Sequence, residues 1–169
     1  MSRRPSYWFI IQLTIRGAPN ARLSMLLGYC HGETLAWQLA NPGYPEGLAA
    51  LAHDNYRFAR AISKETLNHI ISGGPSQGES VALQLARTDA GLAILKFDDF
   101  LLARMISAGT LNHIILEGHN KGGSVALALA TTQAGRAILQ LDESRLARMI
   151  SVDTLNHNGP VKGLSVALH

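Results

Sequence analysis

Three Asn-His pairs are the groups in this sequence whose chemistry and spacing first point to a functional site. The tetrapeptide Thr-Leu-Asn-His occurs three times and ends at His69, His113 and His157, so each copy follows the last by 44 residues. Histidine titrates near neutral pH and binds metals, while an asparagine amide both donates and accepts hydrogen bonds. The pairs would suit an active site, a metal site, or a series of hydrogen bonds between repeated units.

The regular 44-residue interval argues against a shared metal or catalytic centre. Equivalent residues of successive helical units lie about 10 Å apart, whereas zinc requires all its ligands at about 2 Å from one ion. The sequence has no His-x-x-x-His or Cys-x-x-Cys motif, and His119, which follows His113 closely, has no further ligand near it in the sequence. We therefore expect no metal and no cofactor.

A second candidate for chemistry is the segment GPSQG from Gly74 to Gly78, which matches the G-x-S-x-G pattern of a nucleophile elbow. That elbow needs a strand before the serine and a helix after it. Here the preceding segment is predicted to be helical, and the loop 44 residues later carries Asn120 in the place of Ser76. We interpret both segments as turns between helices and predict that the chain is not an enzyme.

The three asparagines leave two interpretations open. In solenoids of the armadillo type, asparagines on successive units bind the main chain of an extended peptide, because an amide both donates and accepts. Alternatively, each Asn-His pair bonds to the backbone of the adjacent unit and satisfies groups left open at helix ends. We favour the second interpretation. The candidate partner-binding residues are Asn68, His69, Asn112, His113, Asn156 and His157.

The elements that must position these residues are set by an internal repeat. Residues 59–102 (the first full unit) and 103–146 (the second full unit) are identical at 26 of 44 positions. A truncated unit follows at 147–169, and a degenerate unit at 21–58 precedes them, with two extra residues in its NPGYPE turn. Residues 1–20 are expected to form an N-terminal segment or cap. Repeats of this period are the signature of a solenoid.

Within a unit the local signals are helical. Apolar residues recur at intervals of three and four, and alternating runs are scarce. We predict a short helix through TLNHII, a Gly-rich turn, a helix through SVALQLA or SVALALA, and two further helical stretches, the last starting at Asp98 or Asp142. The fold class is therefore all-α, a right-handed α-solenoid of 44-residue multi-helix repeats. The predicted N-caps of the first helices are Ser63, Ser107 and Ser151.

The third unit differs from the other two after its Asn-His pair. It lacks three residues between His157 and Lys162 relative to the second full unit. The sequence Asn158-Gly159-Pro160 is typical of a turn. We therefore expect its first helix to be shortened and interrupted there.

The stretch GESVALQLARTDAGLAIL resembles part of an ankyrin repeat. Gly78, Ser80 and Ala86 stand where the pattern G-x-T-P-L-H-x-A-A has its glycine, threonine and second alanine. Val81 and Leu83 replace the proline and the histidine. The period of 44 residues is longer than the ankyrin period of about 33, so the resemblance covers part of a unit.

The array as a whole resembles the long helical repeats found in effector proteins of intracellular bacteria such as Legionella and Coxiella. That resemblance covers residues 32–169 and implies a protein that acts inside a host cell. The array is also similar to the repeats of TAL effectors, which are helical with a Gly-rich loop between helices. This second similarity implies binding to DNA.

Composition and charge narrow the class of function. The chain is 47% hydrophobic and 16% charged, as folded domains are. Its net charge is +3 and its basic residues are scattered, so a nucleic-acid partner is not expected. No stretch approaches the roughly 20 apolar residues of a membrane span. The single cysteine, Cys30, fits a reducing compartment, which predicts a cytoplasmic protein or one secreted by a bacterium into a host cell.

Positions that differ between the otherwise similar units indicate a recognition surface. The residue pairs at 64–65, 108–109 and 152–153 vary, and so do the Gly-rich loops. We predict a non-enzymatic helical-repeat scaffold that binds a protein or peptide along its concave face. The alternatives are TAL-like nucleic-acid binding and a regulatory array of a larger enzyme. Because the array stops inside a unit, we expect a fragment or a decayed end, or else an oligomer that pairs through its open C-terminal repeat.

Overall fold

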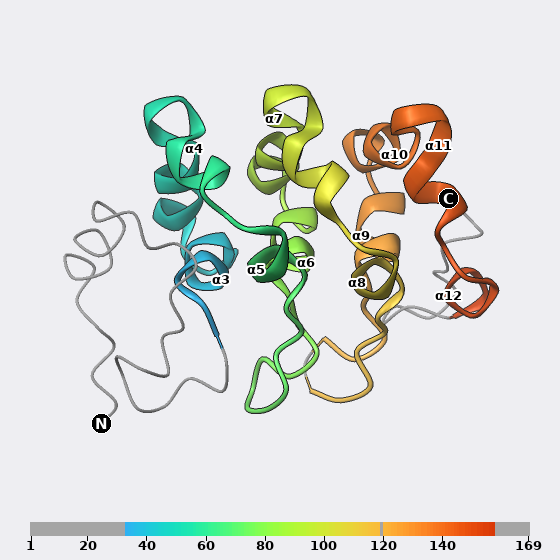
Figure 1. Ribbon diagram of the computed structural model, residues 1–169. Coiled ribbons are helices and arrows are strands. Elements are labelled where there is room, and N and C mark those ends of the chain that lie inside the picture. The colour runs from blue at the N-terminus through green and yellow to red at the C-terminus, as the bar shows by residue number, and fades with distance from the viewer. Residues whose placement is uncertain (1–32, 119, 158–169) are drawn as a thin grey trace.

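The computed structural model describes residues 33–118 and 120–157. Of these residues 65% are helical and none lies in a β-strand, so the all-α expectation is confirmed. The helices form a row, which begins with α3 (Leu35–Ala40) and α4 (Pro45–Arg60) and ends with α11 (Leu141–Arg148) and α12 (Val152–Asn156) (Figure 1). The segment 1–20, Cys30 and the Asn158-Gly159-Pro160 turn lie outside the described residues.

The helices recur at the interval of the sequence repeat. The helix that carries the asparagine appears as α5 (Lys64–Asn68), α8 (Ala108–Asn112) and α12, each starting 44 residues after the last. The next helix appears as α6 (Val81–Ala86) and α9 (Val125–Ala130). The long α7 (Asp89–Met105) corresponds to α10 (Gln133–Leu139) together with α11. In the degenerate unit, four residues separate α3 from α4 where two separate α6 from α7, as the longer NPGYPE turn predicts.

Serine caps start the asparagine-bearing helices. The hydroxyls of Ser63, Ser107 and Ser151 each accept a hydrogen bond from the backbone N–H three residues on, at 3.1 to 3.2 Å, which confirms the predicted caps. Each helix ends at its asparagine because the following histidine has extended backbone angles. The helices are therefore shorter than TLNHII predicts. The expectation that the first helix of the third unit is shorter than the others is wrong, since α12 is five residues long, as α5 and α8 are.

Glycines allow the helices within each unit to cross closely. A β-carbon at Gly91 of α7 would lie 2.2 Å from the carbonyl oxygen of Leu85 at the end of α6. Gly47 and Gly135 meet Leu39 and Leu129 in the same way, at 2.4 and 2.1 Å. No side chain fits at these distances, so glycine fixes the helix crossing. Around it, α6 packs against α3 and α9, and buried leucines, isoleucines and alanines form one core along the row.

A left-handed turn interrupts α4, α7 and α11 at equivalent places. Left-handed backbone costs L-residues roughly 1–2 kcal/mol each, less for Asp and Asn, and each turn begins with Asp. The pair Asp98-Asp99 thus lies in this turn, directly before the last helical stretch of α7. The residues with positive φ are Asp54, Asn55, Tyr56, Asp98, Asp99, Phe100, Asp142, Glu143 and Ser144.

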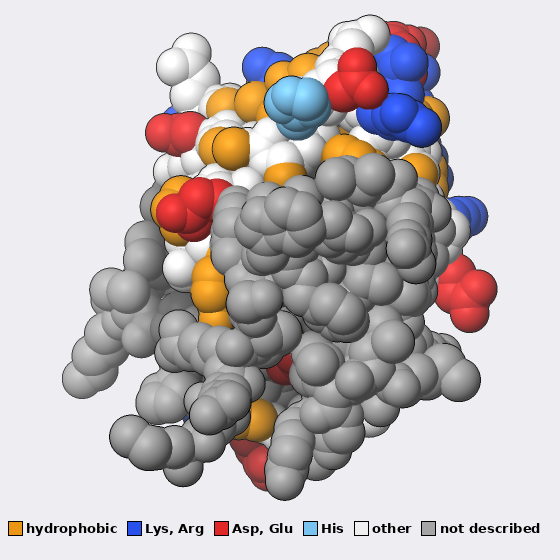
Figure 2. All heavy atoms as spheres, turned by 90° about the vertical axis from the view of Figure 1, so that its left-hand side faces the viewer, with side chains coloured by type: hydrophobic (Ala, Val, Ile, Leu, Met, Phe, Trp, Pro, Cys, Tyr) orange, Lys and Arg blue, Asp and Glu red, His pale blue; other side chains and the backbone are white. Residues whose placement is uncertain are grey.

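Exposed ion pairs connect these turns along the row. Arg60 of α4 approaches Asp98 of α7 at 3.4 Å, and Arg104 of α7 approaches Asp142 of α11 at 3.1 Å in the equivalent contact. On the end of the molecule where the described chain begins, acidic and basic side chains lie next to each other along the upper edge (Figure 2). Exposed pairs of this kind contribute little to stability.

Candidate partner-binding site between the two full units

Asn68 hydrogen-bonds to the backbone of the next unit. Its Nδ2 donates to the carbonyl oxygens of Lys64 and Met105, both at 2.8 Å, and its Oδ1 accepts from the N–H of Ser107 at 2.8 Å. The Thr110 hydroxyl donates to the carbonyl of Asn68 at 3.1 Å. The amide thus fills the gap between the end of α7 and the start of α8. This is the geometry of the second interpretation, in which the asparagines join neighbouring units.

Asn112 repeats this arrangement toward the third unit. Its Nδ2 donates to Ala108 and Met149 at 2.9 and 2.8 Å, and its Oδ1 accepts from Ser151 at 2.7 Å. Asn156 is the last residue of α12 and occupies the same place near the end of the described chain. We call the contacts of Asn68 and Asn112 with the following unit the asparagine seam.

The histidines lie directly after the seam, at the start of the Gly-rich loops. His69 and His157 each bury an Nε2 atom that has no hydrogen-bond partner among the described residues. Burial lowers the pKa of His113 below its ordinary value. Its Nε2 lies beside Gly78 of the preceding unit, 3.4 Å from where a β-carbon would stand. His113 therefore contacts the loop of the unit before it and is predominantly neutral at pH 7.

In both full units the Gly-rich loop is closed at its neck by a β-bulge pairing. The N–H of Ile115 donates to Gly123 at 3.0 Å, and its carbonyl accepts from Gly122 at 2.7 Å. Gly122 has a φ of 81°, the left-handed conformation that such a bulge requires of its first residue. The first full unit has the same pairing between Ile71 and Gly78-Glu79, with a φ of 83° at Gly78. Glycine at this position is thus dictated by the loop.

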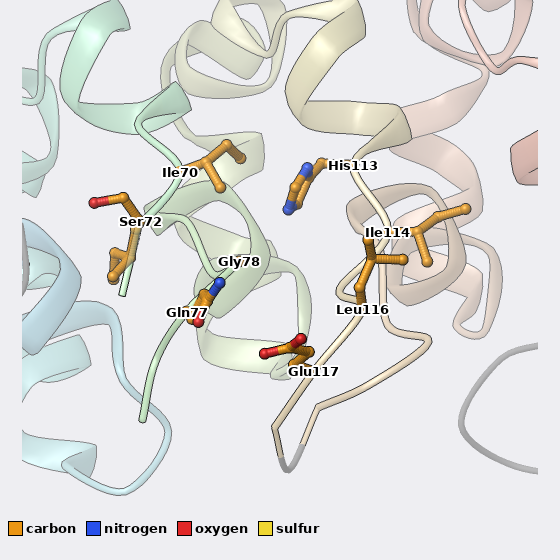
Figure 3. Close-up of a pocket in the computed structure, with 9 residues that line it drawn as sticks. Ile70, Ser72, Gln77, Gly78, His113, Ile114, Leu116 and Glu117 are labelled. Atoms are coloured by element: carbon orange, nitrogen blue, oxygen red, sulfur yellow. The ribbon is translucent and has the colours of Figure 1, made fainter. Parts of the chain in front are cut away.

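A pocket of about 270 Å³ lies between these two loops (Figure 3). Five of its nine residues are the same in both full units and are buried or half-buried: Ile70, Ile71, Gly78, His113 and Ile114. The other four are exposed and differ between the units: Ser72, Gln77, Leu116 and Glu117. We call the first set the floor of the pocket and the second set its rim. The rim includes Leu116, whose exposure of 73% is high for a large apolar residue.

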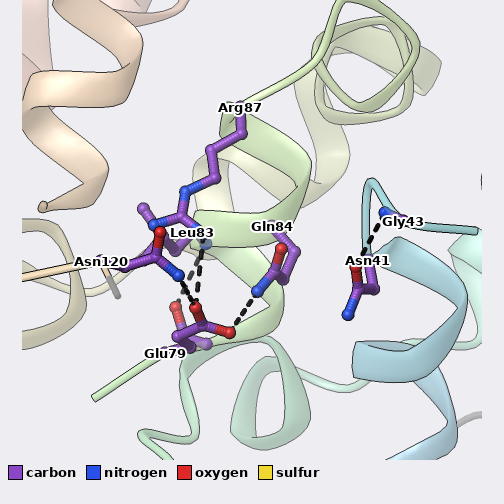
Figure 4. A network of polar contacts seen from close by, with 8 residues as sticks. Asn41, Gly43, Glu79, Leu83, Gln84, Arg87 and Asn120 are labelled. Atoms are coloured by element: carbon purple, nitrogen blue, oxygen red, sulfur yellow. Dashed lines mark hydrogen bonds and ion pairs between the residues drawn. The ribbon is translucent and has the colours of Figure 1, made fainter. Parts of the chain in front are cut away.

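A buried polar cluster joins the same two units (Figure 4). Glu79 is buried, with 5% of the residue exposed. It accepts hydrogen bonds from the side chains of Gln84, Arg87 and, across the interface, Asn120. The Arg87 guanidinium also lies beside Gly123 of the second full unit, 3.6 Å from where a β-carbon would stand. We call Glu79, Gln84, Arg87 and Asn120 the Glu79 cluster.

Sequence reasoning missed the cluster, although the repeat carries a signal for it. The degenerate unit has Glu33 and Gln38 at the corresponding places, and they too are hydrogen-bonded, at 3.0 Å. The second full unit has Gly123 and Ala128 there, so the two positions change together. The sequence identifies the rim only in part, because the variation of the loops does not show which loop residues face the neighbouring unit.

The remaining sequence candidates can be placed as well. Ser76 lies in the turn of the first loop, where its carbonyl accepts from Glu79 at 3.1 Å, and no β-strand precedes it in the described chain. Across residues 33–118 and 120–157, no three His, Cys, Asp or Glu side chains gather as metal ligands would. Within the same ranges, no helix combines the length and apolar character that crossing a membrane demands.

Comparison with protein-family models, with curated proteins and with solved structures finds no match to this chain.

Proposed function

We propose that the protein is a non-enzymatic helical-repeat scaffold that binds a protein or peptide partner. The partner would bind at the loop edge, the surface formed by the Gly-rich loops of the two full units. The observation that carries the proposal is the division of the inter-unit pocket into a floor and a rim. The floor residues are shared by both units and are buried or half-buried, while the rim residues are exposed and differ. A repeat array that recognises partners keeps its framework and varies such surface positions.

The proposal includes the architecture. We infer a right-handed α-solenoid of 44-residue units, supported by the recurrence of the helices and of the seam at that interval. The asparagine amides are occupied by backbone groups of their own chain. The partner is therefore proposed to contact the loop edge, with His113 contributing to the pocket, rather than the asparagines. The resemblance to bacterial effector repeats supports a host protein as the partner.

Selection from a display library of random linear peptides tests the proposal. The immobilised chain should enrich a peptide consensus, and the variant Leu116→Ser/Glu117→Gly should not. This variant copies Ser72 and Gly73 of the first full unit, so it replaces the two rim residues of the second full unit with residues that the fold already accepts. The matched control is Lys64→Ala/Glu65→Gly, which copies positions 108–109 onto α5, away from the pocket. The control should enrich the same consensus as the unchanged chain.

Two results would contradict the proposal. One is a library from which no peptide is enriched over a blank surface. The other is binding to duplex DNA that weakens steeply with added salt, because phosphate contacts dominate such binding. The second result would favour the TAL-like alternative.

A further inference from the structure

The second full unit has a free backbone edge at two residues that line the pocket. Pairing at the loop neck uses the N–H and the C=O of Ile115. In an extended chain, alternate residues direct these groups to opposite edges. No described residue hydrogen-bonds to the backbone of Ile114 or Leu116, the two neighbours. Both line the pocket (Figure 3). An edge with unpaired N–H and C=O groups is a template for another extended chain.

The side chains around this edge are apolar. Ile70 and Ile114 are half-buried on the two sides of the pocket, and Leu116 lies on its rim. A volume of about 270 Å³ is below the usual range for drug-sized ligands and suits one large aliphatic side chain. The pocket thus offers main-chain pairing along the edge and a single apolar contact beside it.

The charge of Glu117 indicates which partner residue can lie next to that apolar contact. Glu117 follows Leu116 on the rim and is exposed, and its carboxylate makes no ion pair or hydrogen bond with a described residue. It extends toward the side of the pocket that carries Gln77 (Figure 3). An unpaired carboxylate at a rim favours a basic partner residue and discriminates against an acidic one.

We propose that the pocket binds a segment of a partner chain in extended conformation, which pairs its backbone with Ile114 and Leu116 as an added strand. One aliphatic side chain of the segment enters the pocket, and an adjacent lysine or arginine pairs with Glu117. Strand addition is a general mode of peptide recognition, in which the main chain supplies affinity and pockets supply specificity. The inference rests on the proposed function and specifies the chemistry of its ligand.

The probes are fluorescein-labelled peptides of the sequence Gly-Ser-Lys-Val-Xaa-Lys-Val-Ser, with Xaa as leucine, alanine or aspartate. Fluorescence anisotropy with the full chain should show binding of the leucine peptide, about tenfold weaker binding of the alanine peptide, and none of the aspartate peptide. A second series carries one N-methyl group at each successive backbone nitrogen of the leucine peptide. Affinity should fall about tenfold at alternate positions only, because a strand pairs through every second residue.

Protein variants locate the site of binding. Glu117→Gln should remove the preference for a lysine neighbour, measured with peptides that carry glutamine in place of lysine, and leave the leucine preference intact. Leu116→Ser/Glu117→Gly should abolish binding of the leucine peptide, and Lys64→Ala/Glu65→Gly should keep it. Circular dichroism melting curves verify that each variant is folded.

Several outcomes would overturn the inference. N-methylation without effect, or with equal effect at every position, excludes pairing with the edge. No binding by any probe excludes the proposed ligand chemistry, and a consensus from the display library would then show that the proposed function still holds. Sedimentation should show a monomer. A dimer abolished by Leu116→Ser/Glu117→Gly would mean that a second copy of this chain occupies the edge.

Discussion

The asparagine seam and the Glu79 cluster both join the first full unit to the second, and they differ in how they recur. The seam continues from Asn68 to Asn112, which bonds to the third unit at nearly the same distances. The cluster has no counterpart at the next position, where Gly123 and Ala128 replace Glu79 and Gln84. The seam needs one side chain, because its partners are backbone groups that every unit provides. The cluster needs four side chains at once, so losing one favours losing the others.

Of the variants that test this comparison, removal of the Glu79 carboxylate is expected to have the largest effect on stability. In Glu79→Ala, Gln84, Asn120 and the Arg87 cation lose their common acceptor in a buried site. We expect the free energy of unfolding to fall by about 3 kcal/mol, measured by urea denaturation. The triple variant Glu79→Gly/Gln84→Ala/Arg87→Thr copies the second full unit and should lose less, since it also removes two of the three donors. A larger loss in the triple variant would show that the cluster is not a self-contained unit.

Asn68→Ala is expected to have the next largest effect. It leaves the carbonyl of Met105 and the N–H of Ser107 without partners in a half-buried interface, which costs about 2 kcal/mol. Asn112→Ala should match it within about 0.5 kcal/mol, and the two losses should add, because the sites share no partner.

The same variants separate the two interpretations of the asparagines. Peptide affinity should be unchanged in Asn68→Ala and Asn112→Ala at temperatures where both are folded. A specific loss of affinity without a loss of stability would instead make the asparagines partner-binding residues.

Lowering the pH should weaken the contact of His113 with the loop of the preceding unit and leave the asparagine seam unchanged. Burial lowers the pKa of His113 below its ordinary value of 6.5, so the unfolded chain takes up a proton more readily than the folded chain. His113 therefore reduces stability as the pH falls below about 6.5 and has no such effect above it. In His113→Gln this part of the pH dependence should disappear. The loss in the free energy of unfolding caused by Asn68→Ala, measured by urea denaturation, should be the same above and below pH 6.5, since an amide does not titrate.

Arg104→Gln should show the smallest effect. Arg104 is exposed and bridges Asp142 of its own unit and Asp99 of the preceding unit, and these carboxylates raise its pKa. Solvent screens such pairs, so we expect only a slight decrease in melting temperature that vanishes at high salt. A decrease comparable to that of Asn68→Ala would show that these exposed ion pairs, and not the seam, hold the units in register.

Much of the local structure could be predicted from the sequence. Serine at the N-cap acts within one helical turn, so Ser63, Ser107 and Ser151 identified the helix starts. The helix ends were predicted too late, because the apolar pattern of TLNHII continues past the histidine at which the backbone becomes extended. The left-handed turns were not predicted, since aspartate next to a helix is also typical of an ordinary helix start.

By itself the sequence determined the 44-residue interval, the all-helical class and the separation of the three Asn-His pairs. These follow from local propensity and spacing, which repeat with the residues. Only the tertiary structure decided which groups face the neighbouring unit: that Asn68 is bound to backbone, that Glu79 reaches Asn120, and that Leu116 and Glu117 share a pocket with Ile70. Such contacts join residues about one repeat apart, and their partners depend on how closely adjacent units pack, which no single unit encodes.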